Sequence, residues 1–263
     1  MKKGMKDNIE RKKPSINEVN FYNSIPMFSF IELNINEICN RVCPFCPRVD
    51  PEIYPNQNIH MSVDLAEKIA SELKQIEFTG IVNISGTGEP LLTKNIPEII
   101  EKFGKNDIHI EVVTNGDVLA SKSGPEIIKK CDESLFSLRD RWYDESENFG
   151  LLYTNRAGTI ENQKIETAKL PCYYTHYSMY IDWNGDVLLC CQDMYNRTVK
   201  FGNANDNKII EIWKDARLSE YRKMLNDGDR SNSPCNNCNA NGRVFGKNHA
   251  DSWSGSYFKN VKT

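Results

Sequence analysis

The sequence predicts an α/β protein: a partial (β/α)6 barrel of the TIM type, followed by a small C-terminal α+β domain made of a β-hairpin and a helix. Two observations support this prediction. Strand-like apolar segments alternate with segments of helical spacing in the first half of the chain, and repeated βα units of this kind close into full or partial barrels. The alternation stops near residue 163, and an Asn-Gly pair at 184–185 then gives a strong hairpin signal.

Each element follows from a local pattern. The apolar run at 26–33 predicts the first strand, and Ser62 is placed to cap a helix over 62–70. Gly86 to Pro90 breaks the second strand, and Asn115-Gly116 closes the third. The other predicted elements are strands at 80–85, 108–114 and 134–138, a helix at 96–103, hairpin strands at 179–182 and 187–191, and helices at 209–213 and 218–225.

The chain is therefore expected to have four parts. They are a polar N-terminal segment over residues 1–25, the barrel over 26–165, the second domain over 166–250, and a tail over 251–263.

Composition excludes several classes of protein. With 33 Lys and Arg against 36 Asp and Glu, the net charge of −3 gives no basic surface for nucleic acid, so no nucleic-acid partner is expected. No run approaches the roughly 18 apolar residues of a membrane helix, and the first thirteen residues lack the apolar core of a secretory signal. We expect a cytoplasmic protein whose nine cysteines are reduced thiols.

Most of these cysteines fall into two groups. Cys39, Cys43 and Cys46 form C-x3-C-x2-C in the loop after the first strand. Three thiolates on a four-iron cluster leave one iron open to a substrate, whereas a structural zinc site normally has four ligands. The second group contains Cys172, the adjacent pair Cys190 and Cys191, Cys235 and Cys238. Neighbours on a strand face opposite sides, so one of the pair can be a ligand and the group offers four thiolates, enough for a closed site. Two zinc sites, or buried apolar thiols, are the alternative.

The first group resembles the signature of the radical S-adenosylmethionine (radical SAM) superfamily, with an aromatic residue, here Phe45, before the last cysteine. Gly86-Thr87-Gly88-Glu89-Pro90 is similar to the glycine-rich segment with which that family holds the methionyl amino group of SAM. Residues without a Cβ let backbone carbonyls approach an ammonium closely, and Glu89 adds negative charge. The resemblance implies that Cys39, Cys43 and Cys46 hold a [4Fe–4S] cluster whose open iron binds SAM.

Three further residues are expected to contact SAM. Thr114 and Asn115 end the third strand, at the edge where barrel loops build active sites, and the resemblance implies contacts to the ribose; turn chemistry explains them almost as well. Arg139, at the end of the fourth strand, is placed to bind the carboxylate of SAM. A solvated arginine, or one paired with Asp140 or Asp144, is the alternative.

The second domain resembles the twitch version of the SPASM-type auxiliary-cluster domain. Its C-x12-G-x4-C and C-x2-C elements select Cys190 over Cys191. No cysteine follows Cys238, so the resemblance implies one auxiliary [4Fe–4S] cluster with four ligands. These ligands are Cys172, Cys190, Cys235 and Cys238. Cys191 and Cys131 are then expected to be core thiols.

Within the superfamily the chain is similar to dehydrogenases that oxidise an aminocyclitol alcohol in 2-deoxystreptamine biosynthesis. Asn155-Arg156-Ala157-Gly158 belongs to the match, and Arg156 is implied to contact the substrate in the active site; a structural ion pair is the alternative. The implied reaction starts with hydrogen abstraction by a 5′-deoxyadenosyl radical from a polar, hydroxylated small molecule such as an amino sugar, cyclitol or nucleotide sugar. The auxiliary cluster then accepts an electron as the alcohol becomes a carbonyl. The implied partner is a one-electron reductant such as flavodoxin or ferredoxin.

Other functions remain open. A redox-neutral epimerase would need a hydrogen donor, and Cys191 or Cys131 offers a thiol. Peptide-modifying relatives often add an N-terminal leader-binding domain, for which a first strand beginning near residue 27 leaves no room. A zinc-stapled binding module is the non-enzymatic alternative.

Overall fold

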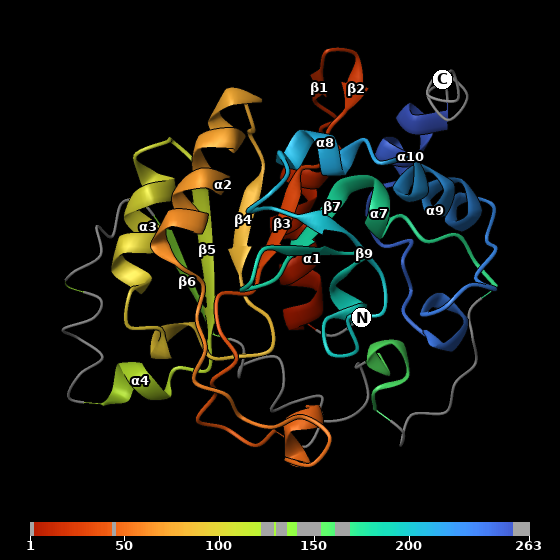
Figure 1. Cartoon of the computed structure of the whole chain (residues 1–263). Coiled ribbons are helices and arrows are strands. Elements are labelled where there is room, and N and C mark those ends of the chain that lie inside the picture. The colour runs from red at the N-terminus through yellow and green to blue at the C-terminus, as the bar shows by residue number, and fades with distance from the viewer. Residues whose placement is uncertain are drawn as a thin grey trace.

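The computed structural model describes residues 3–43, 46–121, 129, 136–140, 154–160 and 169–254. Its centre is a seven-stranded sheet in the order β6-β5-β4-β3-β7-β8-β9 (Figure 1). Strands β3 to β7 run parallel, whereas β8 and β9 are antiparallel additions at one edge. The strands are β3 (Phe30–Leu33), β4 (Ile81–Ile84), β5 (His109–Thr114), β6 (Phe136–Asp140), β7 (Ser178–Ile181), β8 (Asp186–Leu188) and β9 (Lys200–Asn203). The α/β class and its parallel strands are confirmed.

The two faces of the sheet are covered by different helices (Figure 1). Ile31 and Leu33 of β3 share one apolar cluster with α2 (Val63–Gln75) and α3 (Ile96–Gly104). Phe30 belongs to a separate cluster, in which Ile16 of α1 (Lys3–Asn17) packs. This division follows from the alternation of side chains along a strand. The N-cap of α2 is as predicted, because the hydroxyl of Ser62 accepts the N–H of Leu65 at 3.1 Å.

The N-terminal segment is more ordered than its polar sequence predicted. It contains α1 and a small hairpin of β1 (Phe21–Tyr22) and β2 (Ile25–Pro26). Arg11 pairs with Glu111 of β5, and the ammonium of Lys12 lies 4.3 Å from the centre of the Phe30 ring. Burial lowers the pKa of Lys12. These contacts join residues far apart in the chain, so no local pattern could show them.

The predicted hairpin forms at Asn184-Gly185, where Gly185 has a φ of +89° that favours glycine. Its first strand, β7, pairs in parallel with β3, so the sheet continues across the boundary predicted near residue 165. The second strand was predicted to reach residue 191 but ends at Leu188. The chain then turns into the 3-10 helix η4 (Cys191–Asp193).

Short helices complete the second half of the chain: α7 (Tyr174–Tyr177), α8 (Ile209–Trp213), α9 (Ala216–Asn226) and α10 (Lys247–Ser254). The guanidinium of Arg222 lies 3.9 Å from the ring centre of Trp213 and 4.0 Å from that of Trp253. It also donates to the carbonyl of Thr175 at 2.8 Å, which fixes α9 against α7 and α10. The predicted tail begins inside α10, which runs to Ser254.

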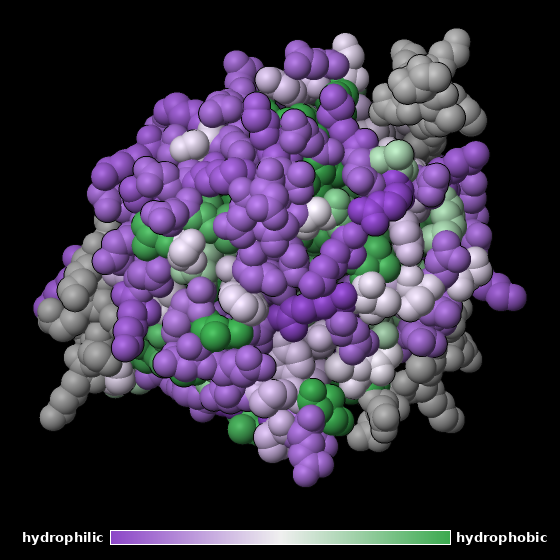
Figure 2. Space-filling view, in the orientation of Figure 1, coloured by the Kyte–Doolittle hydropathy of each residue, from purple (hydrophilic) through white to green (hydrophobic). Residues whose placement is uncertain are grey.

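The surface drawn in Figure 2 is mostly hydrophilic, and apolar residues show there only as small separate patches. Among the helices of the described residues, none is long and apolar enough to cross a membrane.

Candidate active site

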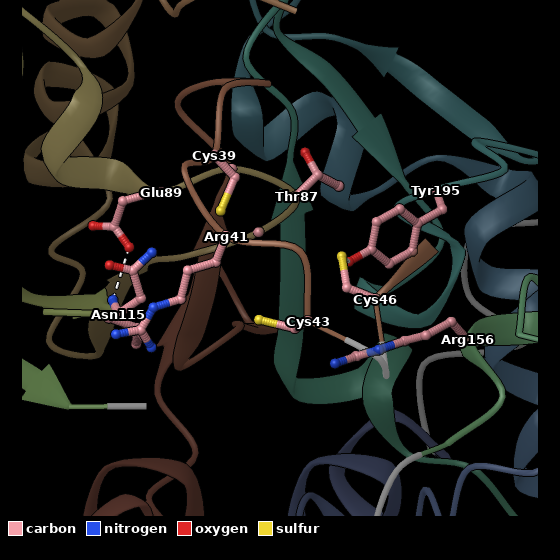
Figure 3. Close-up of a pocket in the computed structure, with 12 residues that line it drawn as sticks. Cys39, Arg41, Cys43, Cys46, Thr87, Glu89, Asn115, Arg156 and Tyr195 are labelled. Carbon is pink, nitrogen blue, oxygen red and sulfur yellow. Dashed lines mark hydrogen bonds between the residues drawn. The ribbon is translucent and has the colours of Figure 1, made fainter. Parts of the chain in front are cut away.

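A pocket opens at the carboxyl ends of β3, β4 and β5, where the loops after these strands meet. It brings together most of the residues predicted to bind the first cluster and SAM. Figure 3 shows Arg41, Glu89 and Asn115 on one side of the three thiols, and Tyr195 and Arg156 on the other. The lining residues are Cys39, Arg41, Cys43, Cys46, Gly86, Thr87, Gly88, Glu89, Val113, Asn115, Arg156 and Tyr195.

The cysteine loop is held from within by Arg48, whose side chain is 3% exposed. Its guanidinium donates to the carbonyls of Glu37 at 2.6 Å, Thr87 at 2.7 Å and Pro55 at 3.0 Å, and to the carboxylate of Glu37 at 3.1 Å. One side chain therefore joins the cysteine loop to the glycine segment. Sequence reasoning missed Arg48; its position two residues after Cys46 was the only local signal.

Buried charges connect this loop to the second domain. Arg197 pairs with the carboxylates of both Glu37 and Asp182, whose side chains are 4% and 0% exposed. Tyr54 donates to Glu37 at 2.7 Å and accepts from Arg197 at 2.8 Å, and burial together with the Glu37 charge raises its pKa. The hydroxyl of Tyr195 lies 3.4 Å from the sulfur of Cys46. Residues 195–197 of the second domain thus support the wall of the first pocket.

The glycine segment lies tightly against the residues that follow β3. A Cβ on Gly86 would lie 2.4 Å from Oδ1 of Asn34, and one on Gly88 would lie 1.6 Å from Oδ1 of Asn36. The amide of Asn36 donates to the carbonyl of Glu89 at 2.7 Å. The glycines are therefore required by packing within the protein, as well as leaving the backbone accessible on the pocket side.

Glu89 fixes the end of β5. Its carboxylate accepts the hydroxyl of Thr114 at 2.7 Å, the N–H of Asn115 at 2.7 Å and the N–H of Leu91 at 3.1 Å. These contacts bring together Glu89, Thr114 and Asn115, three of the residues predicted to contact SAM. Thr114 and Pro90 lie behind the pocket wall and not among the lining residues.

A second cation of the pocket, Arg41, was not predicted. Its guanidinium donates to Asp117 in α4 (Asp117–Ala120) at 2.7 Å, and this bond lowers the pKa of Asp117. The contact ties the cysteine loop to the segment after β5. Arg139 stands in β6, opposite Val113. Phe45 and the side chain of Arg139 lie outside the described residues.

The four thiols of the second group line another pocket, between η4, α9 and the 3-10 helix η5 (Cys235–Asn237). Burial raises the pKa of each thiol, that of Cys235 to about 12. The four are Cys172, Cys190, Cys235 and Cys238. Leu189, Leu225 and Ala240 are among the other lining residues. Within the described ranges, no three His, Cys, Asp or Glu side chains gather closely enough to hold a single metal ion.

The adjacent cysteines separate as expected, although by a different route. Cys190 lies past the end of β8 and faces the second pocket, whereas Cys191 begins η4 and packs with Tyr180, Leu188 and Met194. The turn into η4, and not strand alternation, directs them apart. Cys131 lies outside the described part of the chain.

Thiolates are the usual ligands of iron–sulfur clusters, so both pockets suit such a group. Three thiols in the first leave room for a non-protein ligand beside polar and charged residues, and the second offers four thiols in a mainly apolar wall.

Two family models match the chain. One, described as the radical SAM superfamily, matches residues 33–138, and another, described as the SPASM iron–sulfur cluster-binding domain, matches residues 172–239. The first range contains all three cysteines of the first pocket, and the second contains all four thiols of the second pocket.

Curated relatives agree with these matches. The chain is 26% identical to the S-adenosyl-L-methionine-dependent 2-deoxy-scyllo-inosamine dehydrogenase of Niallia circulans, over 81% of this chain and 93% of that enzyme. It is 29% identical to the GTP 3′,8-cyclase of Synechocystis sp., over 47% of this chain and 38% of that enzyme.

Solved structures show the same fold. BtrN in complex with AdoMet and 2-DOIA matches with a TM-score of 0.66 and 24% identity, over 82% of this chain and 94% of that one. Streptococcus suis SuiB bound to the precursor peptide SuiA matches with a TM-score of 0.54 and 16% identity, over 89% of this chain and 73% of that one. With its three-cysteine loop, its glycine segment and its second thiol-lined domain, the chain belongs to the radical SAM superfamily, as an enzyme that uses SAM and [4Fe–4S] clusters.

Proposed function

We propose that this enzyme oxidises an alcohol group of a polar, hydroxylated small molecule to a carbonyl, the molecule being an amino sugar, a cyclitol or a nucleotide sugar. One observation carries the proposal: Arg156 lines the pocket of the three thiols, and the next residue packs against Cys238 of the four-thiol pocket. A substrate held by Arg156 would therefore lie near both sites. Similarity to a 2-deoxy-scyllo-inosamine dehydrogenase over most of the chain supports the substrate class.

Each of the two sets of cysteines would hold one iron–sulfur cluster. Cys39, Cys43 and Cys46 would hold the SAM-binding cluster, and the thiols of the second pocket would hold the auxiliary cluster. SAM on a reduced cluster supplies a carbon-centred radical that takes a hydrogen atom from an unactivated carbon. The proposed SAM contacts are Phe45, Gly86, Thr87, Gly88, Glu89, Pro90, Thr114, Asn115 and Arg139.

The residues of this chain would bind SAM in distinct ways. The backbone of Gly86 and Gly88 leaves space for an ammonium to approach peptide carbonyls, and the nearby carboxylate of Glu89 favours its positive charge. Asn115 presents a polar side chain at the end of β5, where a ribose hydroxyl can bind. Glu89 holds Asn115 by its N–H, so one carboxylate would orient both contacts.

Arg156 would act on the substrate. Oxidation of a secondary alcohol to a ketone removes one hydrogen atom, one proton and one electron. A guanidinium that donates hydrogen bonds to the substrate oxygen stabilises the negative charge that develops as the proton leaves. The four-thiol site, in its mainly apolar wall, is suited to accept the electron.

We also propose an electron donor and a cellular location for the enzyme. The initial electron would come from a one-electron reductant of the flavodoxin or ferredoxin class, and the enzyme would work in the cytoplasm, where its thiols stay reduced.

The test is an anaerobic assay. Reconstituted enzyme should carry about eight irons, and with SAM, dithionite and 2-deoxy-scyllo-inosamine it should release deoxyadenosine and a ketone in equal amounts. The absence of deoxyadenosine would contradict the proposal as a whole. Deoxyadenosine without a ketone would contradict the substrate class.

A redox-neutral epimerase is the second candidate function, with the thiol of Cys191 as its hydrogen donor. Cys191 is 6% exposed, and burial together with the charge of Glu32 raises the pKa of its thiol, so the sulfur keeps a hydrogen that it could donate. An epimerase would transfer the thiol hydrogen to the substrate carbon. Reaction in deuterated water separates the two functions, because an epimerase places deuterium on carbon and a dehydrogenase does not. Cys191→Ala should abolish deuterium transfer and leave any ketone formation.

A further inference from the structure

Residues 155–158 form a left-handed turn between the two thiol pockets. Arg156, Ala157 and Gly158 have φ angles of +49°, +53° and +92°. Such angles are uncommon for residues with a Cβ and cost conformational energy, so surrounding contacts must hold the turn. Thr159 supplies two of them, because its N–H and its hydroxyl donate to the carbonyl of Arg156 at 3.2 and 2.8 Å.

Asn155 clamps this turn to the segment around Cys238. It is fully buried, and its side-chain amide donates to the carbonyl of Asn237 at 2.6 Å. Its N–H donates to Oδ1 of Asn239 at 2.8 Å, and the N–H of Asn239 donates back to Oδ1 of Asn155 at 3.2 Å. This set of hydrogen bonds from Asn155, here called the clamp, therefore holds Asn237 and Asn239, the residues on both sides of Cys238. A Cβ on Gly158 would lie 3.2 Å from Cβ of Asn237, so the packing is close.

The turn also packs against Cys238. The backbone N–H of Ala240, the residue after the clamped Asn239, donates a hydrogen bond to the sulfur of Cys238 at 3.5 Å. Ala157 and Ala240 pack with Cys238 in one small apolar cluster. Arg156, the residue before Ala157, points its side chain into the other pocket (Figure 3). Successive residues of one strained turn thus serve the two sites.

We propose that the turn of residues 155–158 couples the two sites: it positions Arg156 for the substrate and, by holding Asn239 and thus the N–H of Ala240, sets the reduction potential of the cluster ligated by Cys238. Asn155 and Asn239 are then positioning residues. The inference rests on the proposed function, which places the auxiliary cluster on Cys238 and the substrate on Arg156.

The coupling has a direction. An N–H donated to a ligating sulfur stabilises the more negative, reduced cluster and raises its reduction potential, which suits an electron acceptor. A substrate that binds Arg156 shifts the neighbouring Asn155, and through Asn239 this changes the hydrogen bond from Ala240. By linkage, a change at Cys238 alters substrate affinity to the same extent.

The experiment measures the auxiliary cluster by EPR during redox titration of the reconstituted full chain, with and without 2-deoxy-scyllo-inosamine as the probe. Asn155→Ala and Asn239→Ala break the clamp from opposite sides. We expect both to lower the midpoint potential without probe, to lose the probe-induced change in the EPR spectrum and to weaken probe binding about tenfold. Ala157→Gly leaves both clamp asparagines in place and is expected to keep the wild-type potential.

Asn95→Ala is the matched control. Asn95 also donates its amide to a carbonyl, that of Met61 at 3.1 Å, but it stands before α3, away from both pockets. Wild-type potentials in both clamp variants would overturn the inference. The potential measured without probe does not depend on the substrate, so a wrong substrate class would show as an unresponsive wild-type enzyme with altered potentials in the clamp variants.

Discussion

The two thiol pockets of this enzyme lie close together but differ in what surrounds their sulfur atoms. The first is built from strand-end loops, its three cysteines are partly exposed, and Arg41, Glu89 and Arg156 share its wall. The second is built from short helices and turns, and Cys235 and Cys238 are each 8% exposed beside leucine and alanine side chains. A site that must admit SAM and a substrate needs polar groups and access, whereas a fully ligated cluster can be sealed by apolar packing.

The largest expected effect comes from the first pocket. Replacing Cys39, Cys43 and Cys46 with Ala should remove about four of about eight irons and abolish deoxyadenosine formation, because no cluster remains to bind and reduce SAM. Iron analysis and chromatography of the reaction mixture measure both outcomes. Deoxyadenosine at the wild-type rate would show that this loop is not the SAM site.

A double variant in the second pocket should separate SAM cleavage from substrate oxidation. Cys235→Ala combined with Cys238→Ala should also remove about four irons, but deoxyadenosine formation should persist while ketone formation stops, because the electron acceptor is lost. The ratio of ketone to deoxyadenosine is the measurement. A ratio equal to that of the wild type would remove the second pocket from the electron path.

The buried support of the first pocket should matter next. Arg48→Met leaves the Glu37 carboxylate with one cation fewer and the carbonyls of Thr87 and Pro55 without the donor that Arg48 provides. We expect a loss of about 3 kcal/mol in unfolding free energy, or about 8 °C in Tm, together with weaker retention of the first cluster. Thermal unfolding and iron analysis test this expectation.

Arg217→Met is the control for that variant. Arg217 is 62% exposed and lies 3.4 Å from Asp215 on the surface, so its loss should change Tm little. Equal changes in Tm for Arg48→Met and Arg217→Met would mean that the buried network contributes no more than a surface ion pair.

The smallest effects distinguish two glycines, Gly88 in the lining of the first pocket and Gly116 directly after the lining residue Asn115. Gly88→Ala places a Cβ on the side chain of Asn36 and should cost about 2 kcal/mol and weaken SAM binding. Gly116→Ala meets nothing within 4 Å, but its φ of +79° should cost about 1 kcal/mol without affecting SAM. Denaturant unfolding and SAM binding compare the two. Equal SAM affinities would show that the Gly88 contact with Asn36 does not shape the site.

The sequence predicted those parts of the site that have local signals. The spacing of the cysteines, the glycine segment, the Asn184-Gly185 turn and the strands of the barrel each depend on near neighbours in the chain. Arg48 and Arg197 could not be predicted in this way. One of the two carboxylates that Arg197 binds, that of Glu37, is 160 residues away in the chain, so only the fold brings these two charges together.

The N-terminal helix escaped prediction for a related reason. The segment carries Pro14 within the helix and few apolar residues, and neither property favours a buried element. It is held by contacts of Ile16 and Arg11 with the sheet, which its own sequence does not reveal.

The parallel pairing of β3 with β7 determines whether this enzyme can be divided. β3 is buried between β4 and β7, so a fragment ending near residue 165 would present a bare apolar strand edge to solvent, which promotes aggregation. The part of the chain with the three-thiol pocket and the part with the four-thiol pocket therefore share one continuous sheet and form a single folding unit. We therefore expect the first part, expressed alone, to need a substitute for β7 along the exposed edge of β3.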